Sequence, residues 1–455
     1  MTKCNLGNIL DDLAKSSEGS ECLDLFKESV EASHAALEVF RQEYTPVMWA
    51  RTQNNLGVAL TAQTGFIEES QKKSLLKESV EAYHKALQVC TQQYIPLEWA
   101  MTQCNLADAV LAQALLSEGH DRIDLFIRAT EYYQAALQIY TRDFSPSEWG
   151  KIQRTLALTF YFLGREVGEK GFLETAIEYF KAVLAVYTRE NSPEEWAEIQ
   201  KWLGEICKRL SQDSQVPIME EAIQHYQAAS EVYTHDAFPV KSAEIQFDLG
   251  NLYFILVKNQ RGNYLEQTVQ CYESALQIYS KDNYPEEWAK IQLNLGSTYT
   301  DLVTGDRQNN LQRAIVCYQS VEDIYTQDAH PFEWALIQCG LGHIYSHLSN
   351  RDKKNMDRAI AYYQKTFEIL TRENFPYEWA QTSFFLGNAY LQFLSGDREE
   401  NLKSAIDYYQ MALQVRTRES FPLEWARTQI NMGSAYLELP LNEQQAKNAC
   451  VLITV

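Results

Sequence analysis

The chain has 455 residues, of which 45% are hydrophobic, and a net charge of −21 from 61 acidic and 40 basic side chains. This excess of negative charge opposes nonspecific binding to nucleic acids and anionic membranes, so neither partner is predicted. No apolar stretch reaches the length of a membrane span. Nine cysteines without close pairing are typical of a reducing compartment, and we expect a cytoplasmic protein.

One short segment recurs along the whole chain. A Pro-x-x-Trp sequence, or a remnant of it, begins at prolines 46, 96, 146, 193, 239, 285, 331, 376 and 422, in steps of 45 to 50 residues. Self-similarity at such a regular period predicts a solenoid, in which each repeat buries its apolar face against its neighbours.

Each proline predicts the start of a helix, called helix A here, because proline is favoured at the first helical position. Ser145 and Ser192 precede two of these prolines, and we expect them to act as N-caps, with Glu148 and Glu195 completing capping boxes. An apolar stripe then follows at helical spacing. Its clearest copy is Trp288, Ile291, Leu295 and Tyr299.

A second helix, helix B, is predicted after each helix A. Its clearest copy is residues 401–415, with Asn401 as the expected N-cap after a turn at residues 396–398. The predicted fold is all-α, a solenoid of stacked antiparallel helix pairs with about nine full repeats and a terminal helix. The array covers residues 1–438, and residues 439–455 form a C-terminal tail outside the repeat pattern.

These residues resemble the tetratricopeptide (TPR) repeat. Leu295, Gly296 and Tyr299 match its first helix, and Ala222 and Tyr226 belong to the match with its second helix. The resemblance implies a right-handed superhelix. The unit is about twelve residues longer than the usual 34-residue repeat. The long unit is similar to TPR arrays found beside caspase-like CHAT proteases in bacteria.

No motif predicts catalysis. The chain lacks a phosphate-binding loop, a dinucleotide fingerprint, a nucleophile elbow and a zinc-type Cys-x-x-Cys. His343 and His347, at positions i and i+4, could share a metal ion, but no third ligand is evident. We therefore predict neither an enzyme nor a metal or cofactor site.

The TPR resemblance implies a concave groove, lined by the A helices, that holds a peptide. Asparagines recur at two positions of helix A, immediately before the leucine of the Leu-Gly pair and two residues after it: Asn5, Asn8, Asn55, Asn105, Asn251, Asn294, Asn388 and Asn431. An amide both donates and accepts hydrogen bonds, so this series suits an extended peptide backbone. In the alternative interpretation, the asparagines bond between adjacent repeats and hold the stack together.

A set of basic and aromatic residues is the second candidate. The basic members are Lys151, Arg154, Lys201, Lys208 and Arg209, and the aromatic members are Tyr161, Phe162, Phe247 and Phe254. Such a set suits an acidic peptide or a C-terminal carboxylate. The alternative is an ordinary solvated helix face with aromatic residues in the core.

These patterns predict a noncatalytic scaffold that binds a peptide or partner protein in its groove. The alternative function is a regulatory or sensor arm of a CHAT-type caspase-like protease system whose protease domain is absent from this chain. The oligomeric state stays open.

Overall fold

A computed structural model describes residues 20–211, 216–258, 264–348 and 352–439. Within these ranges the chain forms only helices and their connections, so the predicted all-α fold of paired helices is confirmed. None of the described helices combines the length and the apolarity needed to cross a membrane. Asn5, Asn8 and the tail from residue 440 lie outside the described residues.

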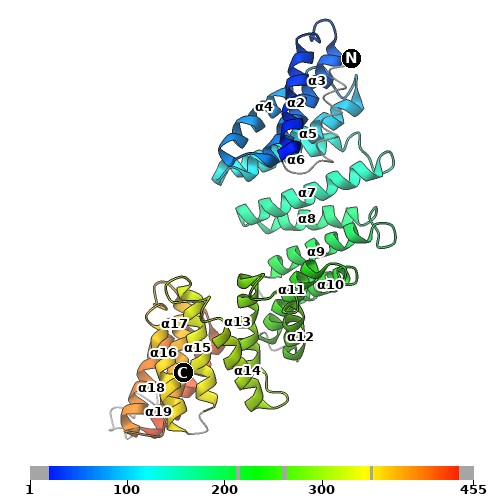
Figure 1. Ribbon diagram of the computed structural model, residues 1–455. Helices are drawn as coiled ribbons and strands as arrows, with labels where there is room; N and C mark the ends of the chain where they lie inside the picture. The colour runs from blue at the N-terminus through cyan, green and yellow to red at the C-terminus, as the bar shows by residue number, and fades with distance from the viewer. Residues whose placement is uncertain (1–19, 212–215, 259–263, 349–351, 440–455) are drawn as a thin grey trace. The chain divides into compact units, whose positions relative to one another are not determined.

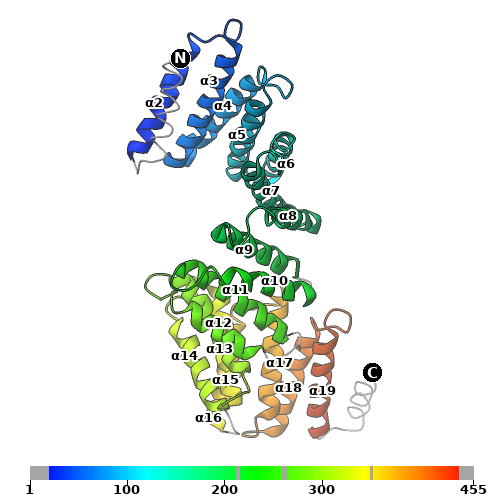
Figure 2. The ribbon, with the colours of Figure 1, turned by 90° about the vertical axis from the view of Figure 1, so that its right-hand side faces the viewer.

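The chain divides into two compact units, Met1–Val232 and Tyr233–Val455. Figures 1 and 2 show that A and B helices alternate along the chain in both. The first unit contains α2 (Ser20–Leu37), α3 (Pro46–Gln63), the short 3-10 helix η1 (Thr64–Phe66), α4 (Glu69–Leu87), α5 (Pro96–Leu115), α6 (Gly119–Ala136), α7 (Pro146–Val167), α8 (Lys170–Val183), α9 (Pro193–Leu210) and α10 (Val216–Ser230).

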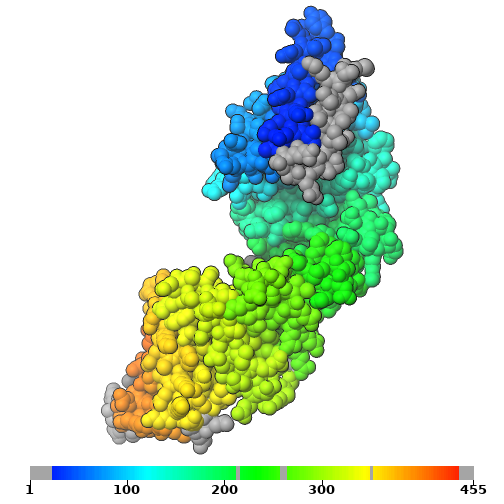
Figure 3. Space-filling view, viewed as in Figure 1, coloured from blue at the N-terminus to red at the C-terminus, as the bar shows by residue number. Residues whose placement is uncertain are grey.

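The second unit follows the same alternation. It contains α11 (Pro239–Lys258), α12 (Leu265–Ala275), α13 (Pro285–Asp301), α14 (Arg307–Ser320), α15 (Pro331–His347), α16 (Lys353–Thr366), α17 (Pro376–Gln392), α18 (Arg398–Leu413) and α19 (Pro422–Glu438). The odd-numbered helices of both units are A helices and the even-numbered ones are B helices. In the space-filling view the side chains of successive helices in this unit pack closely (Figure 3).

A tyrosine of helix B packs directly on a glycine of helix A in most pairs. A Cβ atom on Gly387 would lie 2.7 Å from Tyr409 Cε1, and one on Gly250 would lie 2.6 Å from Tyr272 Cε1. Both rings are fully buried. Because interiors are close-packed, any larger residue in place of the glycine would displace the ring. The Leu-Gly and tyrosine elements of the repeat pattern are therefore the two sides of one contact.

Proline stands in the first turn of the A helices, as predicted, but the expected serine caps do not form. The side chains of Ser145 and Ser192 accept no backbone hydrogen bond at the helix start. Instead, Ser145 Oγ donates to Glu148 Oε2 at 3.1 Å. Ser145 and Ser192 have ψ of 70° and 68°, outside the extended conformation that is usual for a capping residue.

The predicted cap at Asn401 is also wrong. Helix α18 begins three residues earlier, and the Asp397 carboxylate accepts hydrogen bonds from two backbone N–H groups of its first turn. Gly396 precedes it with φ of 84°, a conformation that favours glycine. Asn401 is buried inside the helix, where its amide donates to the backbone oxygens of Phe393 at 3.0 Å and Ser395 at 2.9 Å. It therefore holds the preceding turn closed instead of starting the helix.

Candidate functional site

The predicted asparagines of the second unit bond to one another across repeats. Asn251 on α11 accepts, at Oδ1, a hydrogen bond from Tyr272 Oη at 2.7 Å. The same oxygen accepts from Nδ2 of Asn294, on the next A helix, at 3.1 Å. One carbonyl thus joins helix α11 to its partner α12 and to α13.

The same arrangement recurs three repeats later. Asn388 Oδ1 on α17 accepts from Tyr409 Oη at 2.7 Å and from Asn431 Nδ2 on α19 at 2.8 Å. In the first unit, Asn105 Nδ2 donates to Oδ1 of Asn54, the residue before the predicted Asn55, at 3.0 Å. These are the repeat-to-repeat contacts of the stacking interpretation, and the ligand-binding interpretation stays a prediction.

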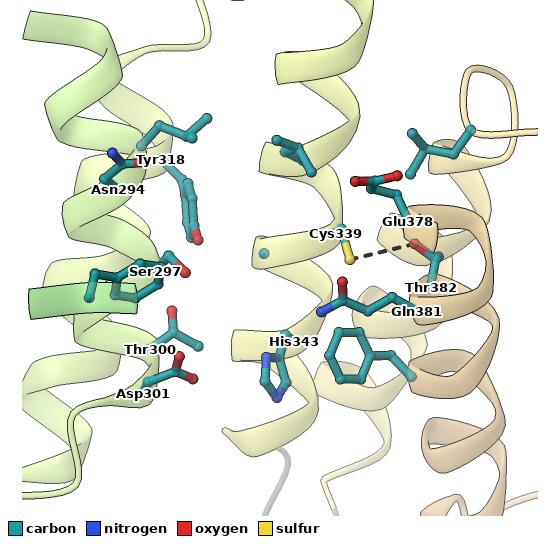
Figure 4. A pocket seen from close by; sticks show the side chains of 16 residues that line it. Asn294, Ser297, Thr300, Asp301, Tyr318, Cys339, His343, Glu378, Gln381 and Thr382 are labelled. Carbon is teal, nitrogen blue, oxygen red and sulfur yellow. Dashed lines mark hydrogen bonds between the residues drawn. The ribbon is translucent and has the colours of Figure 1, made fainter. Parts of the chain in front are cut away.

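A cavity of about 300 Å³ opens between the A helices of the second unit (Figure 4). Its walls come from α13, α15 and α17, with Phe254 of α11 at one side. Asn294 and Ser297 face it from α13, and Gln381 and Thr382 face it from α17. Two of the predicted groove residues, Phe254 and Asn294, therefore lie on one cavity.

Gly340 of α15 forms part of the wall of the first cavity. This residue occupies the position of helix A that carries Asn294 and Asn431 in other repeats, so the asparagine series is interrupted on α15. The space beside it is taken by Tyr318 of α14, since a Cβ on Gly340 would lie 2.6 Å from Tyr318 Cζ. The ring also lines the cavity. A missing side chain on α15 therefore shapes this wall.

A second cavity, of about 490 Å³, adjoins the first. The two share His343 and Phe385 as lining residues. Asn388 and Asn431, both predicted for the groove, line the second cavity. Together the two cavities run along the A helices from α13 to α19, and we name them the α13–α19 groove.

Two titratable groups of the groove, His343 and Cys339, are uncharged at physiological pH. Burial, with the nearby His347 and Arg307, lowers the pKa of His343 to about 3. Its Nε2 lies 2.9 Å from His347 Nε2, and its ring stacks on Phe385 with centroids 4.6 Å apart. Burial raises the pKa of the Cys339 thiol to about 11. A protonated thiol and a very weak base do not make a nucleophilic pair.

Two carboxylates give the first cavity its charge. Asp301 closes α13 at one end of the cavity, and Glu378 lies in the first turn of α17 at the other (Figure 4). No lysine or arginine is among the described residues that line this cavity. The second cavity has one cationic side chain, Arg427. The first cavity is therefore suited to neutral or basic groups.

The predicted basic residues all lie in the first unit, and two of them are paired with carboxylates. Lys151 Nζ lies 3.5 Å from Glu148, and Lys208 contacts the Glu205 carboxylate. Glu205 also accepts from Tyr161 Oη at 3.4 Å. Tyr161 itself is buried. Much of this positive charge is therefore offset locally.

The other members of that set are divided between the units. Arg154, Lys201 and Arg209 are half-buried on α7 and α9. Phe162 stacks on a core phenylalanine of α6, and Phe247 of the second unit packs on the core cluster around Tyr272. Phe162 and Phe247 therefore fit the alternative interpretation, in which the aromatic residues belong to the core. Phe254, by contrast, lines the groove.

Several groove residues were missed by the sequence patterns. Ser297, Gln381 and Thr382 were not predicted, and His343 was considered as a metal ligand or as an exposed or groove-facing histidine. They occupy one stripe of helix A with helical spacing, for example Leu336, Cys339, Gly340 and His343 on α15. Extending the search by one helical turn to either side of the Asn294 register on each A helix would have included them.

Comparisons with known proteins identify no family. No protein-family model and no curated protein matches the chain. Among solved structures, the apo form of RapI is 14% identical over 92% of this chain and 97% of that chain, with a TM-score of 0.48. The TPR domain of P58(IPK) is 14% identical over 97% and 99%, with a TM-score of 0.30. The Cut9–Hcn1 assembly of the APC/C is 14% identical over 94% and 92%, with a TM-score of 0.34. Likenesses this distant assign no function.

Proposed function

We propose that this protein is a noncatalytic scaffold that binds an extended peptide segment of a partner protein in the α13–α19 groove. The observation that carries the proposal is the continuity of two cavities along consecutive A helices, joined at His343 and Phe385. A groove that runs along four consecutive A helices, α13, α15, α17 and α19, fits an extended chain better than a compact small molecule.

The walls suggest how such a peptide would be held. Apolar rings at Phe254 and Phe385 offer pockets for side chains, and amides at Asn294, Asn388 and Asn431 offer hydrogen bonds to backbone groups. The carboxylates at the first cavity favour a neutral or basic residue there. This segment of the partner would differ from the acidic one predicted from the basic side chains of α7 and α9.

An acidic segment would have to bind the first unit. Lys208 and Arg209, with Arg165, lie close enough to Tyr161 to act on its pKa, although Glu205 acts in the opposite direction. Changing Arg154, Lys201, Lys208 and Arg209 together to Glu tests that second surface. If this variant loses salt-sensitive binding to acidic peptides, the second binding surface is supported. If binding is unchanged, that surface is excluded.

The groove is tested with a displayed library of random peptides, panned against the full chain. Gln381→Trp places an indole in the first cavity, and Gln319→Trp makes the same substitution on the exposed surface of helix B α14. Peptides enriched by the unmodified protein should lose at least about tenfold in affinity with Q381W, the size expected for a lost anchor pocket. Their affinity for Q319W should not change.

Two results would contradict peptide binding in the α13–α19 groove. One is equal affinity of the enriched peptides for Q381W and Q319W, while circular dichroism shows both folded. The other is the absence of enriched peptides. The alternative function, a regulatory arm of a CHAT-type protease system, would use the same groove, and the partner's sequence would distinguish the two.

A further inference from the structure

Three metal-ligating side chains meet between α9 and α10 of the first unit. Cys207 lies on α9, and Glu221 and His225 lie at i and i+4 on α10. One ligand atom from each lies within 4.8 Å of the other two, and His225 Nε2 lies 3.8 Å from Glu221 Oε1. In a tetrahedral zinc site the ligand atoms are about 3.3–3.8 Å apart, so small side-chain rotations would close the cluster.

The histidine already has the tautomer that metal binding needs. His225 Nδ1 lies 2.6 Å from Gln200 Oε1, which is an acceptor only, so Nδ1 carries the proton and donates. The lone pair of Nε2 therefore faces the cluster. Burial lowers the pKa of His225, which keeps the ring neutral. A histidine that ligates a metal usually donates its other N–H to such a partner.

The cysteine and the glutamate complete a site that is buried on one side and open on the other. Cys207 is 1% exposed, whereas the side chains of His225 and Glu221 are 17% and 42% exposed. An ion can therefore reach the cluster from solvent past Glu221. Burial raises the pKa of the Cys207 thiol to about 12, so binding would release its proton to the solvent.

A lysine lies where a cation would be attracted. Lys181 Nζ of α8 lies 3.1 Å from Glu221 Oε1, the same oxygen that faces His225. The lysine side chain is 52% exposed and can swing into solvent. Lys181 and a metal ion would therefore compete for one carboxylate.

We propose that Cys207 Sγ, Glu221 Oε1 and His225 Nε2 bind a divalent ion of the zinc class, with the fourth position open to water. Thiolate and imidazole together favour zinc over magnesium or calcium. The bound ion would link the two helices of one repeat and stabilise that hairpin. This site is independent of the α13–α19 groove, so it stands whether or not the groove binds a peptide.

The test uses Co²⁺ as a spectroscopic probe, added to the full chain after chelator treatment and in reducing buffer. We expect one equivalent to produce tetrahedral cobalt bands with a cobalt–thiolate charge-transfer band, displaced by Zn²⁺. Cys207→Ser should abolish the charge-transfer band. The matched control is Cys271→Ser, because Cys271 is also buried, with a pKa also raised to about 12 by burial alone.

Variants of the exposed Glu221 and Lys181 side chains keep the test valid where Cys207→Ser reduces folding. Glu221→Gln should weaken Co²⁺ binding, and Lys181→Met should strengthen it by removing the competing ammonium. Gln200→Leu should weaken it about 10–100-fold, as for other lost partners of a ligating histidine. A charge-transfer band that persists in Cys207→Ser, or no binding by the unmodified protein, would overturn the proposal. Unchanged affinity in Lys181→Met would contradict the placement beside Glu221.

Discussion

Removing the Asn388 amide should loosen the last repeats of the second unit. Its Oδ1 accepts from Tyr409 Oη at 2.7 Å and from Asn431 Nδ2 at 2.8 Å. Tyr409 is fully buried, so its hydroxyl has no access to water when the acceptor is lost. Asn388→Ala therefore leaves two donors without their acceptor at once.

The cost can be worked out from these two bonds. A buried donor left without a partner costs about 1–3 kcal/mol, and the amide of Asn431 is half-buried, so we expect about 2–4 kcal/mol in all. Tyr409→Phe alone should cost about 1 kcal/mol, the net value of one hydrogen bond. In the Asn388→Ala background the same change removes an unsatisfied hydroxyl and should cost nothing. The coupling energy between the two positions should thus be about 1–2 kcal/mol.

Hydrogen exchange with mass spectrometry is the suitable assay, because long repeat arrays do not unfold in one step. The opening free energies of peptides from α17 to α19 are compared among the wild type, both single variants and the double variant. The matched trio Asn251, Tyr272 and Asn294 has the same connectivity and should give the same result in α11 to α13. Additive effects of Asn388→Ala and Tyr409→Phe would refute the shared acceptor.

Three further changes probe other features of the second unit. Gly340→Ala should destabilise the protein and weaken peptide binding, because the new Cβ would lie 2.6 Å from Tyr318 Cζ. Alanine also gains about 1 kcal/mol in helix propensity over glycine, so a rise in Tm would show that propensity outweighs the clash and would contradict this prediction. His343 has a pKa of about 3 in the folded protein and 6.5 when unperturbed, so the unfolded state binds the proton first as the pH falls. The stability of the fold therefore decreases below pH 6.5, by up to about 1.4 kcal/mol per pH unit. His343→Gln should flatten that slope in urea titrations between about pH 7 and pH 4, and an unchanged slope would assign it to other groups. Asp397→Ala should reduce the stability of the protein by about 1 kcal/mol, because it removes the N-cap of α18. The amide hydrogens in the first turn of α18 should then exchange faster, and an unchanged exchange rate would show that the cap is dispensable.

The elements that sequence reasoning predicted well are those in which one contact repeats in every copy. The apposition of Gly387 and Tyr409 is an example: the glycine and the tyrosine lie at fixed positions of the unit, so the period alone reveals both. The same holds for the proline that opens each A helix. The N-cap of α18 was predicted wrongly because both Asp397 and Asn401 suit the position, and only the backbone path through Gly396 selects the aspartate.

The sites escaped prediction for a different reason, since each depends on a departure from the repeat. The first cavity is lined by Gly340, which stands where other repeats have asparagine, and a pattern search records that position only as a poor match. The cluster of Cys207, Glu221 and His225 combines two helices, and the spacing between them follows from how α9 packs on α10. A sequence motif with fixed spacing could not contain it.

The asparagine contacts also narrow the kind of peptide that the proposed groove would bind. An asparagine amide can donate and accept, but Asn294 and Asn431 each use the amide nitrogen to hold the preceding repeat. Because that bond orients the whole amide, we infer that the carbonyl oxygen is the atom each offers to a ligand. A series of acceptors requires donors on the ligand, and an extended peptide backbone carries one N–H per residue. The stacking and ligand-binding interpretations of the asparagines are therefore compatible, with the two ends of each amide serving one role each.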